Sequence, residues 1–394
     1  MTGLTVPPVR DAPRRRPKLS AMPSGWLRRR WLRRRWQHLD FSDRAALGMW
    51  ASAHLALFAL AWAAGWAYRS TPGDVPLTGA FEHWDASLYR NIAQYGYFSP
   101  HSTAHNVAFF PGFPLVLAAA HLILRNWVLS ELAVSAVAGC FAVVSLTRLA
   151  GNHRVVLYLL TMPAAVFLTV GYTESLFLAL AVPAWRAAAR GRWYRAALLA
   201  GLAGLVRPDG VFLTCALVVM ALTGPRRERI LNAATACLAL TGPAAYEVYL
   251  WASTHTWNAW SKAMQAGWDL HQVTPVQAFK TSWWAAFDHP YSAGYGWEFQ
   301  MELASMALIV LATLAFLWRR RWPEAVYCGL AAISLGTQTW YTTSMRTLLV
   351  LFPVWIALAE LEARRPWVRS VYVWVGAPLA AVVALLFLAY QWAG

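Results

Sequence analysis

The sequence predicts an all-α protein that crosses a membrane many times. Of its 394 residues, 58% are hydrophobic and only 13% are charged, whereas soluble domains average about 25% charged residues. Several apolar segments approach the roughly 20 residues with which an α-helix spans a bilayer. These segments are long and rich in Ala and Leu without period-two alternation, so a transmembrane β-barrel is not indicated. We therefore expect a polytopic helical bundle.

A basic tail, which we delimit at residues 1–44, opens the chain. It holds twelve Lys or Arg against three acids, and its WLRRRWLRRRW segment alternates tryptophan with arginine triplets. The first part is Pro-rich and is expected to be disordered, and no cleavable signal sequence is predicted. Basic aromatic segments beside an apolar run are typical of binding to anionic lipid of the inner leaflet. An RNA-binding arm has a similar composition, but the adjoining apolar span favours lipid over nucleic acid.

The distribution of charge predicts the orientation, because cytoplasmic loops carry an excess of Lys and Arg. Five further basic patches are Arg148–Arg154, Arg186–Arg195, Arg226–Arg229, Arg319–Arg321 and Arg364–Arg369. Segment 69–126 instead has three Arg against three acids, and segment 252–300 has two Lys against three acids. We expect these two segments to be large extracytoplasmic loops of a multi-pass plasma-membrane protein whose N-terminus is cytoplasmic.

The membrane domain is assigned to residues 45–394, with about ten or eleven spans. The expected spans are 45–68, 127–149, 155–172, 174–189, a broken pair across 196–224, 230–251, 302–318, 323–342, 346–363 and 371–392. Residues 107–124 are also apolar, but a crossing there would place Arg148 and Arg154 outside. The prolines of their FFPGFP motif also break a helix. We therefore expect a short re-entrant or surface-lying helix in the first loop.

Signatures of soluble enzymes are missing from the sequence. It has no HExxH, P-loop or complete GxGxxG motif, and no soluble stretch large enough for a nucleotide-binding domain. The four cysteines lie in apolar segments without CxxC spacing, so neither a disulfide nor a zinc site is predicted. They are Cys140, Cys215, Cys237 and Cys328. Any chemistry is therefore expected at the membrane.

Ionisable side chains collect at the predicted outer face. They belong to the segments FEHWDASLYRNIAQYGYF, GYTES, RPDG and TSMR. Ionisable groups against a membrane are unfavourable and are by default candidates for a functional site. The candidates are Glu82, His83, Asp85, Tyr172, Glu174, Arg207, Asp209 and Arg346.

Each candidate also has a purely structural interpretation. Asp85 precedes a short amphipathic stretch that ends at Gly96, so it can be a helix N-cap. Glu174 can complement the dipole of the helix that follows it, and either arginine can extend its charged end to the interface. The loop histidines lack metal-ligand spacing. The Trp and Tyr residues of 252–300 are expected to form an interfacial belt rather than a stacking platform.

Five segments follow one another in an order found in one enzyme family. They are FEHWDASLYRNIAQYGYF, VAFFPGFPLVL, VGYTESLFLAL, LAGLVRPDGVFL and TSMRTLLVLFP. Through them the chain resembles PIG-V-type (GPI mannosyltransferase 2-like) enzymes of the GT-C glycosyltransferase superfamily, over roughly residues 45–365. It departs from the eukaryotic enzymes in its long basic tail and its RPDG motif. Its Ala-, Arg- and Trp-rich composition suggests a bacterial, high-GC and actinobacterial source.

The resemblance implies a GT-C-like fold that transfers mannose from polyprenyl-phosphate-mannose to a glycolipid or other extracytoplasmic acceptor. It implies that Asp85 is the general base of an inverting transfer, because the acceptor hydroxyl must lose a proton as it attacks. Glu82 is the alternative base, and Glu174 would orient the base or bind sugar hydroxyls. The residues expected to bind the donor phosphate or sugar are His83, Tyr89, Tyr172, Arg207, Asp209 and Arg346. Those expected to bind its lipid are Phe109, Phe110 and Phe113.

Cofactor use and two other functions stay open at this point. Some GT-C enzymes use a divalent cation such as Mg or Mn, for which only Asp85 and Glu174 are candidates here. Broken helices are also typical of transporters, so a flippase for polyprenyl-linked glycans is an alternative. A non-catalytic protein with a GT-C fold is another. The lack of a repeat between the two halves of the chain argues against the transporter.

Overall fold

The computed structural model describes residues 40–67, 77–288 and 293–391 of the chain. Apart from one isolated bridge between Gln272 and Gln338, the regular structure in these ranges is helical, which confirms the all-α prediction. From residue 42 onward, the described residues form one compact unit. The predicted basic tail lies outside the described residues up to position 39, and the structure does not test its lipid binding.

Four helices in the described ranges are long and apolar enough to cross a membrane. They are α2 (Phe41–Ala67), α5 (Trp127–Ala150), α14 (Ala293–Trp318) and α18 (Trp367–Leu388). A fifth crossing is possible for α16 (Ser344–Val350) and α17 (Phe352–Arg364), which are bent by 67°. This number is below the ten or eleven spans expected, because the other apolar segments are divided into shorter helices.

Proline and polar residues account for several of these divisions. The expected span 155–172 ends at Leu160 and resumes as a 3-10 turn at Pro163, whose ring cannot continue a helix. The RPDG motif breaks 196–224 into two helices, as predicted. The shorter α-helices are α3 (Asp85–Tyr95), α4 (Gly112–Leu124), α6 (Arg154–Leu160), α7 (Glu174–Ala189), α8 (Trp193–Val206), α9 (Asp209–Thr223), α10 (Arg229–Cys237), α11 (Thr241–Thr254), α12 (Ala259–Trp268), α13 (Pro275–Phe287) and α15 (Trp322–Gly336). The 3-10 turns are η1 (Leu77–Phe81), η2 (Ala104–Ala108), η3 (Pro163–Leu168), η4 (Arg226–Glu228) and η5 (Leu238–Leu240).

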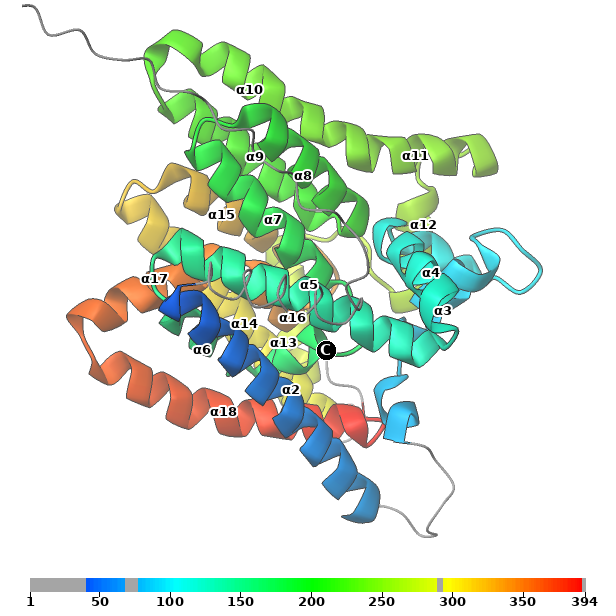
Figure 1. Cartoon of the computed structure of the whole chain (residues 1–394). Coiled ribbons are helices and arrows are strands. Elements are labelled where there is room, and N and C mark those ends of the chain that lie inside the picture. The colour runs from blue at the N-terminus through cyan, green and yellow to red at the C-terminus, as the bar shows by residue number, and fades with distance from the viewer. Residues whose placement is uncertain (1–39, 68–76, 289–292, 392–394) are drawn as a thin grey trace, which may run out of the picture. The chain divides into compact units, whose positions relative to one another are not determined.

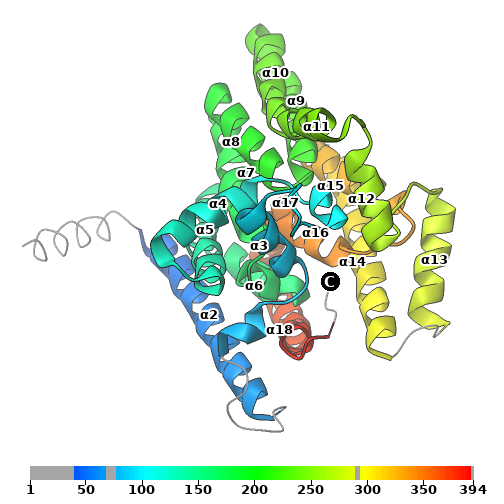
Figure 2. The same ribbon diagram turned by 90° about the vertical axis from the view of Figure 1, so that its right-hand side faces the viewer.

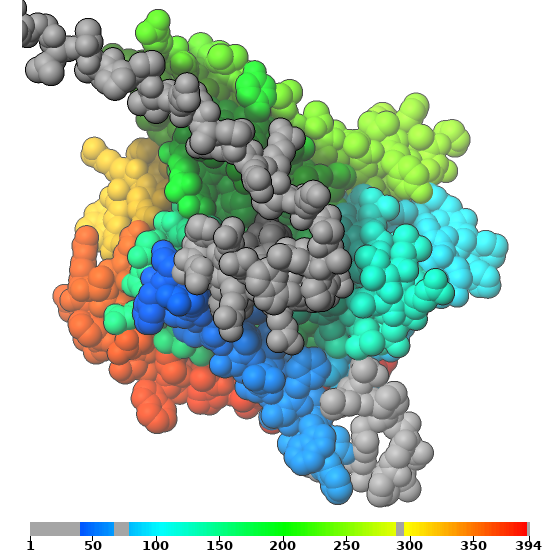
Figure 3. All heavy atoms as spheres, in the orientation of Figure 1, coloured from blue at the N-terminus to red at the C-terminus, as the bar shows by residue number. Residues whose placement is uncertain are grey.

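The centre of this unit is built around α7. Helix α7 packs between α5 and α8, while α9 packs on α10 and α15 (Figures 1 and 2). The spanning window of α5 is 56% buried, whereas those of α2 and α18 are only 22% buried. Helices α2 (blue) and α18 (red) lie along the lower part of the face in Figure 3, and both expose large apolar side chains such as Trp66 and Trp374. This pattern is expected of helices that contact lipid.

Ion pairs join the helix ends that carry the basic patches. Arg148 at the end of α5 pairs with the buried Asp43 of α2 at 2.5 Å. Arg154 and Arg369 both pair with the buried Glu362 of α17, at 2.9 and 3.3 Å. Arginines from basic patches that are far apart in the sequence therefore pair with buried acids on neighbouring helices. The charge pattern had predicted these ends to be cytoplasmic.

Candidate active site

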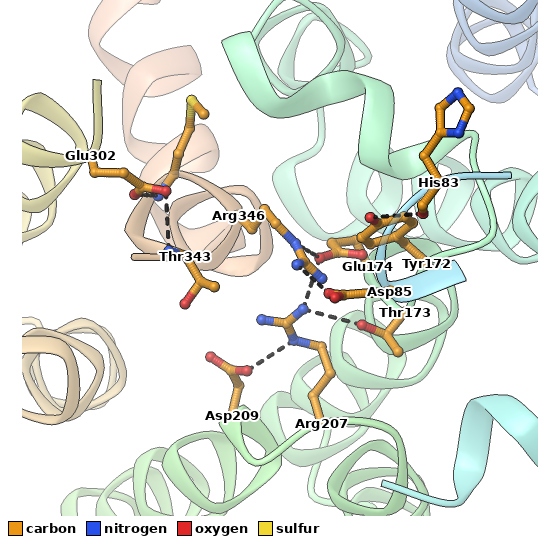
Figure 4. A network of polar contacts seen from close by, with 11 residues as sticks. His83, Asp85, Tyr172, Thr173, Glu174, Arg207, Asp209, Glu302, Thr343 and Arg346 are labelled. Carbon is orange, nitrogen blue, oxygen red and sulfur yellow. Dashed lines mark hydrogen bonds and ion pairs between the residues drawn. The ribbon is translucent and has the colours of Figure 1, made fainter. Parts of the chain in front are cut away.

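Two arginines and three carboxylates form one chain of ion pairs (Figure 4). Arg346 donates from Nη1 to Asp85 Oδ2 and from Nε to Glu174 Oε1, each at 2.8 Å. Arg207 donates from Nη1 to the same Glu174 oxygen at 2.8 Å and from Nε to Asp209 Oδ2 at 2.9 Å. The three carboxylates and Arg346 are buried. Five candidates from four distant segments thus meet at one place.

A strained residue places Asp85 in this network. Trp84, directly before α3, has φ 55° and ψ −123°, which is unfavourable for a bulky residue and is typical of functional sites. Trp84 occupies the N-cap position and Asp85 is the first residue of the helix. The carboxylate of Asp85 does not cap α3 but bonds Arg346 instead. Gly96 ends the helix with φ 78°, as predicted.

Glu174 bonds both guanidinium groups, and Tyr172 packs against that of Arg346. Glu174 is fully buried at the start of α7, and its side chain makes no cap bond there. The Arg346 guanidinium lies over the Tyr172 ring, 4.6 Å from its centroid, in a cation–π contact. The Tyr172 hydroxyl donates to the carbonyl of His83 at 3.4 Å and so links this turn to the loop before Asp85. The arginines therefore have fixed positions before any substrate binds.

Close backbone packing explains why RPDG places Arg207 at the site. Arg207 ends α8 and Asp209 begins α9, so the break in the helix directs both side chains into the network. A Cβ atom at Gly210 would lie 2.3 Å from the Cα of Gly204, so only glycine allows α9 to fold back onto α8 here. The turn between α8 and α9 and the ion pair between Arg207 and Asp209 thus both depend on the RPDG motif.

A cavity of about 180 Å³ opens beside the network. Asp85, Arg207 and Arg346 line it, and its aromatic wall consists of Tyr89, Phe109, Phe110, Trp260 and Trp268. Within the described residues, neither Asp85 Oδ1 nor Nη2 of either arginine takes part in a hydrogen bond. A cavity of about 150 Å³ can hold benzene, so one six-membered ring fits here. One carboxylate oxygen and two guanidinium nitrogens are available to such a ligand.

Other predicted residues have different surroundings. Glu82 pairs with Arg90 and does not line the cavity. The His83 ring packs against Phe387 and Tyr390 outside the cavity, and burial lowers the pKa of His83 below its ordinary value.

Two aromatic candidates lie on or beside the cavity wall. Burial, with a smaller contribution from the nearby Asp85, raises the pKa of the Tyr89 hydroxyl, which therefore stays protonated. Phe113 is fully buried against Tyr89 and has no access to lipid. Phe109 and Phe110 are nearly buried and face the cavity.

Sequence reasoning missed two buried acids, one of which supports the site. Glu302 of α14 accepts from the backbone nitrogens of Thr343 and Met345 at 3.1 and 2.7 Å, and so fixes the turn that carries Arg346. Glu131 of α5 is buried, and neither of its carboxylate oxygens has a hydrogen-bond partner in the described part of the chain. An acid inside an apolar span is the signal that could have found both.

The two carboxylates expected to hold a divalent cation do not fit that role. Arg346 lies between Asp85 and Glu174 and bonds both, so a guanidinium already occupies the place of a cation. Across residues 40–67, 77–288 and 293–391, no three His, Cys, Asp or Glu residues are grouped as metal ligands would be.

Comparison with known proteins finds a partial similarity to one group of enzymes. The chain is 35% identical over 153 residues to GPI alpha-1,6-mannosyltransferase 2 of Rattus norvegicus. It is 33% identical over 154 residues to the Homo sapiens protein of the same name. The chain resembles the GPI mannosyltransferase 2 family, as its motifs predicted.

The similarity to GPI mannosyltransferase 2 covers part of each chain. It extends over 34% of this chain and 30% of either mammalian relative, so the chain matches about a third of their length. No protein-family model matches the chain. No solved structure matches it either.

Proposed function

We propose that the protein is a membrane glycosyltransferase that transfers mannose from polyprenyl-phosphate-mannose to an extracytoplasmic acceptor, such as a glycolipid. The observation that carries this proposal is that Asp85 Oδ1 and two guanidinium nitrogens, all without hydrogen-bond partners in the described residues, belong to side chains that line one cavity the size of a sugar ring. The partial similarity to enzymes named mannosyltransferases supports mannose as the sugar. Because the sugar arrives on a lipid, this chemistry needs no nucleotide-binding domain.

The chemistry requires one base and a stabilised leaving group. The acceptor hydroxyl attacks the anomeric carbon, its proton passes to Asp85 Oδ1, and the bond between that carbon and the phosphate oxygen breaks. Arg346 holds Asp85 through Oδ2 at 2.8 Å, which leaves Oδ1 for the proton. Glu82 is the weaker candidate for the base because it pairs with Arg90 away from the cavity. Configuration inverts because the attack and the departure occur on opposite faces of the sugar.

The leaving group is polyprenyl phosphate, whose negative charge grows as the bond breaks. Charge-assisted donors such as guanidinium groups stabilise such oxyanions, most effectively when their position is fixed in advance. In this proposal Nη2 of Arg207 and Nη2 of Arg346 donate to the phosphate. Glu174 and Asp209 position the two guanidiniums, and the Tyr172 ring contacts Arg346 through a cation–π interaction.

The isoprenoid chain of the donor would lie in an apolar groove of about 380 Å³. Pro111, Pro114 and Leu115 line this groove, whereas Phe109 and Phe110 of the same segment line the cavity. The FFPGFP motif therefore contributes to the walls of both spaces. Phe113 would pack behind this wall against Tyr89 and would not contact the lipid.

Transfer of labelled mannose tests this proposal. The purified protein in lipid nanodiscs is given radiolabelled polyprenyl-phosphate-mannose and a lipid extract that contains candidate acceptors. General-base catalysis contributes about 10²–10⁴-fold, so Asp85→Asn should lose that factor in kcat while its thermal unfolding stays close to wild type. Asp288→Asn, an exposed acid outside the cavity, is the matched control.

Other outcomes would contradict the proposal in distinct ways. Equal transfer by wild type and Asp85→Asn would remove Asp85 as the base. Label that changes leaflet in proteoliposomes without entering a product would favour the transporter. An unfolded Asp85→Asn protein would indicate that the ion pair is structural, and Asp85→Glu would then be needed to separate the two roles.

A further inference from the structure

A second groove of about 320 Å³, which we call the polar groove for its several amide side chains, lies next to the cavity. Its wall is α12 on one side and the two short segments around Gln272 and Gln338 on the other. Three residues, Trp260, Met264 and Leu270, line both the groove and the cavity. The groove and the cavity therefore share part of one wall.

The groove is rich in amide groups that make no internal bonds. The side-chain ends of Asn258, Gln265, Gln272 and Gln338 take part in no hydrogen bond with another residue that the structure describes. Each amide offers both a donor and an acceptor. Neighbouring sugar hydroxyls need this pattern, because every hydroxyl also donates and accepts.

Backbone and side-chain bonds keep the groove in shape. Trp260 Nε1 donates to the carbonyl of Ala108 at 3.1 Å, which fixes the indole ring on the shared wall. His271 and Thr339 exchange backbone and side-chain hydrogen bonds, and Val273 donates to the carbonyl of Thr337 at 2.8 Å. A fixed aromatic surface beside free polar groups is typical of ligand sites. The sequence had suggested only an interfacial belt for the aromatic residues of this loop.

We propose that this polar groove binds the glycan headgroup of the acceptor, with a sugar against Trp260 and its hydroxyls on Gln265 and Gln338. The segment from Gln338 to Arg346 runs from the groove to the cavity, where Thr342, Thr343 and Arg346 form part of the lining. An acceptor hydroxyl at the shared wall would therefore approach Asp85. This inference rests on the proposed function and names the substrate class of the same site.

The double variant Gln265→Ala/Gln338→Ala tests the groove. In the nanodisc transfer assay, loss of hydrogen bonds from both sides should raise the KM for the acceptor about tenfold or more. The KM for the donor and kcat should stay unchanged. Gln277→Ala removes an exposed amide from α13, which lines neither space, and should leave all three constants as in wild type. An unchanged acceptor KM in the double variant overturns the inference.

A binding measurement separates this inference from the proposed function. Saturation-transfer NMR with methyl mannoside, methyl glucoside and methyl galactoside, each alone, reports sugar binding without any transfer. Binding by wild type and Gln277→Ala but not by the double variant supports the groove, even if no mannose is transferred. Binding that survives in the double variant, or no binding of any glycoside to wild type, overturns it.

Discussion

Arg207 and Arg346 donate to the same oxygen of Glu174, each at 2.8 Å. Glu174 is fully buried and comes from a third segment of the chain. One carboxylate oxygen therefore fixes the separation of two guanidinium groups that line the same cavity. Such an arrangement can hold a divalent anion such as a phosphate monoester without a metal ion, because both cations are already in position.

Replacing Glu174 by Gln should weaken both stability and turnover. The amide keeps the shape but removes the charge that offsets two buried guanidiniums. Loss of one partner from a buried ion pair is destabilising by about 3–5 kcal/mol, so thermal unfolding in detergent should shift clearly downward and kcat should fall. Glu360→Gln is the control, because its pair with Arg321 is half exposed and surface pairs contribute little. An unshifted unfolding curve for Glu174→Gln would show that the network is not stabilising.

Arg346→Lys should lose activity although the charge is kept. A single ammonium cannot reproduce the planar fork that bonds Asp85 and Glu174 at once. Loss of one preorganised donor to a developing oxyanion reduces kcat by about 10²–10³-fold, which the transfer assay would measure. Arg321→Lys changes a partly buried residue outside the cavity that also bonds two acids, Glu324 and Glu360, and should remain active. Near-normal kcat for Arg346→Lys would contradict a role in the leaving-group site.

Filling the apolar groove should affect long-chain donors most. Ala118 of α4 lines the groove, so Ala118→Trp would occupy the space proposed for the isoprenoid chain. We expect the donor KM to rise about tenfold or more with a long polyprenyl chain, and by less with a chain of one or two isoprene units. Leu122→Trp lies one turn further on the same helix at an exposed position and should have no effect. Equal KM values for both chain lengths in Ala118→Trp would argue against this groove.

Gly210→Ala should disrupt the fold around RPDG. The added methyl group would lie 2.3 Å from the Cα of Gly204, and backbone atoms cannot move aside as a flexible side chain can. Helices α8 and α9 would have to separate, which would move Arg207 and Asp209. Yield and the unfolding temperature should both fall. At Gly48 in α2 a Cβ meets nothing within 4 Å, so Gly48→Ala should behave as wild type.

Acidification should destabilise the protein partly through His83. Burial lowers the pKa of His83 below its ordinary value of 6.5, so the unfolded chain binds a proton more readily than the folded one. Stability from this residue is complete above about pH 6.5 and is lost as the pH falls through the lower, folded-state value. His83→Gln should therefore show a smaller drop in unfolding temperature between pH 7 and pH 5. An identical pH profile for both proteins would contradict this.

Composition and local motifs predicted much of the fold. Helix class, the break at RPDG and the end of α3 at Gly96 follow from residues close together in the chain. The number of full-length spans did not follow. Hydropathy counts apolar residues but does not report where a helix breaks. The turn η3 interrupts the expected span 155–172, and the bend between α16 and α17 interrupts the expected span 346–363.

For the site, the sequence by itself determined which residue types were exceptional. A carboxylate at Asp85 and an arginine at Arg346 are unusual in an apolar chain, and the family resemblance suggested roles for them. Only the tertiary structure decided that Asp85 bonds Arg346 rather than caps α3, and that Glu82 pairs elsewhere. The physical reason is that an ion pair between positions 85 and 346 depends on how distant helices pack. That packing is set by side-chain shape across the whole core and leaves no local pattern in the sequence.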